Sequence, residues 1–127
     1  MIESNSIYLE YTMNLSKSSE DYLEAIYQIY LTNTKIKSVD IANMLNVSKP
    51  GVNKALKILI ENGLITKQSY GEIHLTEQGI ISAKQIYFKH NTIKSFLIYL
   101  GVDQEIAEED CCKIEHVISN QTLEKIN

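Results

Sequence analysis

A change of hydrophobic period near Gly63 constrains the fold more than any other feature of this sequence. Before Gly63, apolar residues recur with helical spacing in three segments, which are 18–31, 38–45 and 48–62. After Gly63, two short apolar runs, 64–66 and 73–76, flank a polar turn at Tyr70-Gly71 and are typical of paired strands. Three helices followed by a hairpin is the order of a winged helix-turn-helix domain.

The residues at the ends of these segments support the same order. Ser18 or Ser19 can cap the first helix, Ser38 the second and Ser48 the third, because a serine hydroxyl accepts a hydrogen bond from a free backbone N–H. Pro50 lies in the first turn of the third helix, where its missing N–H costs nothing. On the second helix, we expect the buried side to hold Val39, Ala42 and Leu45.

The second half of the chain is predicted to be helical. A long amphipathic helix spans 76–100 and ends at Gly101, and another helix runs from Asp103 to about Ser119. The expected apolar anchors of the long helix are Ile80, Ala83, Tyr87, Ile93, Phe96, Leu97 and Leu100. The sequence therefore predicts a mainly α fold with a small β wing: an N-terminal arm (1–15), a winged helix-turn-helix domain (16–75) and a helical domain (76–127).

Charge is distributed unevenly along the chain, although the net charge is −4. Residues 35–70 hold six lysines against two acidic residues, a surplus of four positive charges. From Gly101 onward there are seven acidic residues against two lysines. This asymmetry indicates that one region faces phosphates while the other attracts cations, although a solvated pattern without function is the alternative.

The second helix of a helix-turn-helix lies in the major groove of DNA, with its N-terminal residues at the base edges. Every one of the 12 basic residues is a lysine, so the arginine–guanine contact is absent and readout depends on lysine, serine and asparagine. The candidate DNA-binding residues are Ser38, Ser48, Lys49, Pro50, Gly51, Asn53, Lys54, Lys57 and Tyr70. Winged helices also serve as protein-docking modules, which is the alternative.

Cys112, Glu115 and His116 have the i, i+3, i+4 spacing that places three metal-ligating side chains on one face of a helix. A thiolate, a carboxylate and an imidazole held in this way can bind a divalent cation. The alternative is that Glu115 and His116 lie on an exposed stripe and that the cysteine is a small buried hydrophobe. Cys111 could also compete for the metal, because Glu115 follows it by four residues.

Other function classes lack support in the sequence. No apolar run approaches the roughly 18 residues of a membrane span, and residues 1–12 lack the pattern of a signal peptide, so we expect a cytoplasmic protein. The adjacent Cys111 and Cys112 cannot form an ordinary disulfide with each other, which agrees with a reducing compartment. Without a recognisable oxyanion-hole motif or phosphate-binding glycine loop, an enzyme is not expected.

Residues 15–127 resemble the metal-dependent repressors of the diphtheria-toxin-repressor and manganese-transport-regulator family. The resemblance rests on SSEDYLEAIYQIY (18–30), IANMLNVSKPGVNKALKIL (41–59), GLI and IHLTEQG (63–79), FKHNTIKSFLIYLGV (88–102) and CCKIEHVIS (111–119). It implies a divalent-metal-responsive repressor of metal-uptake genes that binds a pseudo-palindromic DNA operator as a homodimer. Apolar residues of the last helices, namely Phe96, Ile98, Tyr99 and Ile106, are expected at the subunit contact.

The resemblance also implies a metal site made by three helices. Its ligands would be Asp21, Glu24, His90, Cys112, Glu115 and His116. Cysteine stands at position 112 as in iron sensors, whereas Asp21 and the expected end of the chain before an SH3-like third domain match the manganese branch. We therefore expect Fe(II) or Mn(II) in the cell, and Zn(II) or Co(II) binding in vitro. A metal-independent winged-helix regulator remains the alternative.

Overall fold

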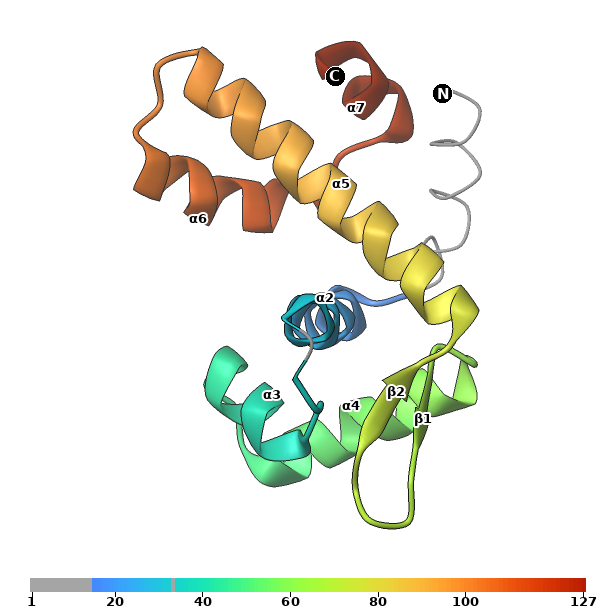
Figure 1. Ribbon diagram of the computed structural model, residues 1–127. Helices are drawn as coiled ribbons and strands as arrows, with labels where there is room; N and C mark the ends of the chain where they lie inside the picture. The colour runs from blue at the N-terminus through green and yellow to red at the C-terminus, as the bar shows by residue number, and fades with distance from the viewer. Residues whose placement is uncertain (1–14, 33) are drawn as a thin grey trace.

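The computed structural model describes residues 15–32 and 34–127 and is mainly helical, with one antiparallel hairpin (Figure 1). Its elements are α2 (Lys17–Leu31), α3 (Ser38–Leu45), α4 (Lys49–Glu61), β1 (Ile65–Lys67), β2 (Ile73–Leu75), α5 (Glu77–Tyr99), α6 (Gln104–Ile114) and α7 (Asn120–Ile126). This confirms the predicted fold class. The predicted N-terminal arm lies outside the described residues, apart from Leu15.

The first half packs α2, α3, α4 and the hairpin around one apolar core. Leu23 and Ile26 of α2, Ile41 of α3 and Leu59 of α4 are fully buried there. In the hairpin, Ile65 pairs with Leu75 and Lys67 with Ile73, and the turn between them forms the wing below the helices in Figure 1. The arrangement is that of a winged helix-turn-helix.

Two helix starts differ from the sequence prediction. Ser16, and neither Ser18 nor Ser19, caps α2, because its hydroxyl oxygen accepts from the backbone N–H of Ser19. Lys37 occupies the cap position of α3 without a side-chain hydrogen bond, so Ser38 is the first helical residue and not the cap. At α4 the prediction is confirmed, since Ser48 accepts from the N–H of Gly51.

The predicted buried face of α3 was wrong for Val39. Val39 is 58% exposed, whereas Ala42 and Leu45 are partly buried and pack against the core, which also contains the completely buried Ile41. Helix α3 contacts α2 on one side and α4 on the other. Which apolar residue of α3 becomes fully buried therefore depends on the two helices packed against it. The apolar pattern of one short helix is not enough to predict that residue.

The long helix α5 passes over α2 and connects the two halves of the molecule (Figure 1). Thr76 caps it by accepting from the N–H of Gly79. A side chain at position 79 would collide with the backbone carbonyl of Leu64, so glycine is required where α5 leaves the wing. Leu100, expected as an apolar anchor, is 60% exposed at the end of this helix.

The far half of α5 forms a second core with α6 and α7. Ile93, Cys111 and Leu123 are buried at its centre. Helix α6 ends at Ile114 and not near Ser119, and Ser119 instead caps α7 by accepting from the N–H of Thr122. Among the described helices, none combines the length and apolar character that a membrane span requires.

Candidate metal centre and DNA-facing surface

His116 connects the second half of the molecule to helix α2. It lies two residues after α6, and its side chain is only 4% exposed. Its Nδ1 lies 2.9 Å from Oε1 of Glu20, and its Nε2 lies 3.0 Å from Oδ1 of Asp21. Two neighbouring carboxylates of α2 therefore hold one imidazole from the end of α6.

His90 forms the matching contact on α5. Its Nδ1 lies 3.1 Å from Oε2 of Glu115, and its Nε2 lies 3.1 Å from Oε1 of Glu108. Lys94 fixes Glu108 in turn, with 2.9 Å between its Nζ and Oε2. Since Glu108 can accept the Nε2 proton, the Nδ1 atom of His90 is left to face Glu115 and the interior of the cluster. A carboxylate that orients a histidine in this way is a common feature of metal sites.

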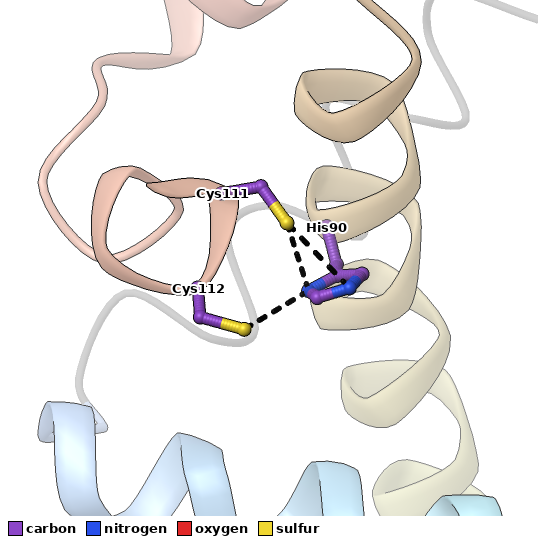
Figure 2. A group of neighbouring side chains, drawn as sticks. All are labelled: His90, Cys111 and Cys112. Carbon is purple, nitrogen blue, oxygen red and sulfur yellow. Dashed lines mark hydrogen bonds between the residues drawn. The ribbon is translucent and has the colours of Figure 1, made fainter. Parts of the chain in front are cut away.

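Two thiols approach the same imidazole (Figure 2). The Sγ atom of Cys111 lies 3.6 Å from each ring nitrogen of His90, and the Sγ atom of Cys112 lies 3.9 Å from Nδ1. Cys111 is fully buried, while Cys112 is partly buried and borders the cleft that Asp21 and Glu24 also line. Both cysteines are free thiols.

Glu24 supplies an unsatisfied acceptor to this cluster. Its Oε2 atom is buried and has no hydrogen-bond partner among the described residues. Burial, reinforced by repulsion from Glu115, raises the pKa of Glu24 to about 7. A buried carboxylate oxygen without a donor is costly unless a cation or a proton joins it.

The donors form three overlapping groups, and the ligating atoms of each group lie within 4.8 Å of one another. These groups are Asp21, Glu115 and His116; Glu24, His90 and Glu115; and His90, Cys111 and Cys112. Two groups offer carboxylates and imidazoles, which suit Mn(II) or Fe(II), and the third offers thiols, which suit softer cations. Together with the unpartnered Glu24 oxygen, this donor chemistry fits a divalent metal.

Without a cation, protons balance much of the negative charge in the cluster. The hydrogen bond to Glu115 raises the pKa of His90 to about 9, against the effect of burial. Burial lowers the pKa of His116, but the hydrogen bonds to Asp21 and Glu20 outweigh it and raise the value to about 9. Burial raises the pKa of Cys111 to about 12 and that of Cys112 to about 11. A bound metal would displace protons from these groups.

All six predicted ligand positions lie in this region, but the reason given for three of them was partly wrong. Cys112 is on α6, whereas Glu115 is its C-terminal cap and His116 lies in the turn beyond, so the triplet is not on one helix face. Sequence reasoning also missed Glu20 and Glu108, which hold the two imidazoles. In the sequence they were marked only by their distance from an expected ligand, since Glu20 precedes Asp21 and Glu108 lies four residues before Cys112.

Some of the predicted DNA-binding residues lie together on the surface of the first half. A surface hollow there is lined by Lys37, Ser38, Val39, Ala42, Lys49, Asn53, Lys67, Tyr70 and Gly71. The hollow unites the start of α3, the start of α4 and the tip of the wing, and it includes four of the predicted residues. Lys37 and Lys67 were not among the candidates, and they add positive charge at its edge.

The other predicted residues lie on α4 outside this hollow. Pro50, Lys54 and Lys57 are exposed, and the two lysines can reach phosphates along the same helix. The Gly51 N–H donates a hydrogen bond to the Ser48 hydroxyl oxygen at the start of α4, so both residues have a structural role in the helix cap. The Lys49 and Asn53 side chains, in contrast, are exposed and face the hollow.

Comparison with known proteins agrees with both surfaces. The family model described as the N-terminal DNA-binding domain of iron-dependent repressors matches residues 14–73, and the one described as their metal-binding and dimerisation domain matches residues 76–127. An uncharacterised helix-turn-helix regulator of Methanocaldococcus jannaschii is 42% identical over 114 residues, covering 88% of this chain and 91% of that protein. The transcriptional regulator MntR of Escherichia coli is 36% identical over 105 residues, covering 83% and 68%.

Solved structures give the same result. The manganese regulator SloR matches with a TM-score of 0.77 and 31% identity, over 88% of this chain and 53% of that one. The T. acidophilum protein IdeR matches with a TM-score of 0.75 and 28% identity, over 84% and 51%. The chain thus spans about half the length of these two solved chains. By sequence and fold, the chain belongs to the iron-dependent repressor family of metal-dependent transcriptional regulators.

Proposed function

We propose that this chain represses transcription when a divalent cation connects α2 to the helices α5 and α6. The observation that carries the proposal is the contact of His116 with Glu20 and Asp21. It joins the end of α6 to a helix of the DNA-binding half, within a cluster whose donor atoms suit a metal. A cation there would add charge neutralisation and coordination bonds across the same boundary.

The residues that would hold the cation come from both halves of the molecule. Asp21 and Glu24 lie on α2, His90 lies on α5, and Glu115 and His116 follow α6. Cys112, the sixth expected ligand, lies on α6 and forms a group with His90 and Cys111 and not with the carboxylates. Glu115 belongs to both carboxylate–imidazole groups, so it supports a cation in either one. Since these two groups contain no sulfur, we expect Mn(II) or Fe(II) in the cell, while Zn(II) or Co(II) bind in vitro.

A cation that fixes α2 would also restrict the movement of the helices that carry the DNA-facing surface. Helix α2 contacts both α3 and α4, and the Leu23, Ile41 and Leu59 side chains share one buried core. Tightly packed cores shift as units, so a constraint on α2 constrains the α4 reading helix as well. A coupling free energy of about 1–3 kcal/mol would change DNA affinity about 5–150-fold.

Repression through a pseudo-palindromic operator needs two reading heads, and we propose a homodimer formed by the second half. Ile98, Tyr99 and Leu100 at the end of α5 and Ile106 on α6 are exposed apolar side chains. Phe96, which is partly buried, borders a surface depression next to Tyr99. Sedimentation should show a dimer at tens of micromolar, and a monomer both with and without metal would contradict this part of the proposal.

The experiment starts from a random DNA duplex library selected with the Mn(II)-loaded protein. Gel retardation of the selected duplex is then measured with Mn(II) and with a chelator, for the wild type, His116→Gln and Glu109→Gln. The exposed Glu109 borders the cleft without belonging to a donor group, so its variant is the matched control. We expect tight binding only with Mn(II), lost in His116→Gln and kept in Glu109→Gln.

Equal retardation with metal and with chelator would instead indicate a metal-independent winged-helix regulator. A failure of the selection to enrich any duplex would favour a protein-docking module. We further propose that the chain acts by binding in the cytoplasm, with metal-uptake genes as its targets, and not by catalysis.

A further inference from the structure

The third donor group differs from the other two in both chemistry and position. His90, Cys111 and Cys112 provide one imidazole and two thiols, which suit thiophilic cations such as Zn(II) and Cd(II). All three residues lie on α5 and α6, whereas each of the other two groups includes a carboxylate of α2. A cation in the third group would therefore not connect α2 to the second half.

The distances in this group match a coordination site. In tetrahedral zinc sites, bond lengths of about 2.3 Å to sulfur and about 2.1 Å to nitrogen place these two atoms about 3.6 Å apart. The Sγ of Cys111 lies 3.6 Å from Nδ1 of His90, and the Sγ of Cys112 lies 3.9 Å from the same atom. The equal distances from the Sγ of Cys111 to both ring nitrogens place this sulfur over the face of the imidazole. Cation binding would therefore require release of the two thiol protons to solvent and rotation of the His90 ring, so that the in-plane lone pair of Nδ1 points at the cation.

His90 belongs both to the soft group and to one of the two carboxylate–imidazole groups, that of Glu24, His90 and Glu115. Nδ1 of His90 lies 3.6 Å and 3.9 Å from the two sulfur atoms and 3.1 Å from Oε2 of Glu115. Its Nε2 is held by Glu108 at 3.1 Å, and Glu108 is paired with Lys94. Because one imidazole nitrogen coordinates one cation at a time, occupation of the two groups through Nδ1 is mutually exclusive.

We infer that His90, Cys111 and Cys112 form a thiophilic cation site that competes with the group of Glu24, His90 and Glu115 for Nδ1 of His90. A Zn(II) or Cd(II) ion held there is bound by residues of α5 and α6 alone and makes no link to Asp21 or Glu24 of α2. The chain thus discriminates between metals by where they bind, since a soft cation binds without producing the DNA-binding form. This last consequence rests on the proposed function, whereas the site itself does not.

The site is tested by titrating the metal-free, reduced protein with Cd(II) and recording the thiolate-to-metal charge-transfer absorbance. We expect two thiolate ligands in the wild type, about half of the absorbance in Cys111→Ser and in Cys112→Ser, and none in the double variant. Full absorbance in Cys111→Ser would overturn the site. Because Cys111 is buried, Cys111→Ala serves as a second variant, and an unchanged Mn(II) affinity shows that either variant has folded correctly.

Competition is tested by titrating Mn(II) into the wild type with and without bound Cd(II), which should lower the apparent Mn(II) affinity; an unchanged affinity would overturn the competition. A pair of variants then tests whether the two ligand sets differ. Glu24→Gln should weaken Mn(II) binding at least about tenfold and leave Cd(II) binding unchanged, whereas Cys111→Ser should weaken Cd(II) binding and leave Mn(II) binding unchanged. Equal losses of both metals in both variants would show a single shared site and overturn the inference.

DNA retardation separates the two proposals. If the Mn(II)-loaded wild type binds DNA and the Cd(II)-loaded wild type does not, both stand. Retardation by the Cd(II)-loaded protein overturns the discrimination alone, and a lack of retardation with Mn(II) overturns the proposed function while the absorbance result stands.

Discussion

Replacing Glu24 by glutamine should stabilise the metal-free protein and weaken its binding of metal. The substitution preserves the size of the side chain and removes its charge. In the wild type, Oε2 of Glu24 is buried without a hydrogen-bond partner among the described residues, and the pKa of the carboxyl group is raised from 4.5 to about 7. A buried amide costs less free energy than a buried carboxylate.

The direction of the pH dependence follows from the raised pKa. A group whose pKa is higher in the folded state than in the unfolded state favours folding most below pH 4.5, and this contribution is lost as the pH rises through about 7. Each pKa unit corresponds to about 1.4 kcal/mol. Because the carboxyl group retains some exposure, solvent screening reduces the expected loss to about 1–2 kcal/mol at pH 8. Glu24→Gln should remove this loss.

The measurement is urea unfolding in the presence of a chelator at pH 4.5 and pH 8, combined with Mn(II) titration at pH 8. At pH 8 we expect Glu24→Gln to be more stable than the wild type by about 1–2 kcal/mol, and at pH 4.5 the two should be nearly equal. The Mn(II) affinity of the variant should fall at least about tenfold. Glu109→Gln, which removes an exposed charge beside the same cleft, should change neither quantity appreciably.

Opposite changes in stability and affinity are the signature of a residue kept for binding at a cost in folding. A variant that is less stable than the wild type at pH 8, with unchanged Mn(II) affinity, would refute this reasoning. It would mean that Glu24 has a structural partner and does not serve the cation.

Three further predictions concern the imidazoles and the DNA-facing surface. Glu20→Gln should lower Mn(II) affinity about tenfold in a competition titration, because Glu20 orients His116 without being in its donor group; unchanged affinity would remove that role. Apparent Mn(II) affinity should rise between about pH 6 and pH 9, since His90 and His116, with pKa values of about 9, must release protons to bind a cation; a flat titration profile would contradict this. Lys67→Ala should weaken DNA retardation uniformly across duplex sequences and reduce the salt slope by about 1, as expected for a phosphate contact; a sequence-dependent loss would instead indicate a base contact.

The sequence was sufficient to predict the order of elements and the general place of the metal centre. Periodicity and local caps are short-range properties, so the three helices, the hairpin and the Ser48 cap could be predicted from neighbouring residues alone. The family resemblance added the expected ligand positions on three separate segments.

Only the tertiary structure decided which residues support those ligands. The Glu20–His116 contact joins residues 96 positions apart, and the Glu108–His90 contact joins residues 18 apart, so no local pattern marks either one. The burial of Ile41 in place of Val39 also depends on the two helices packed against α3. Local sequence sets helical and strand tendencies through short-range sterics and hydrogen bonds, whereas the partners of a buried charge are set by whichever distant side chains the packed core brings within reach.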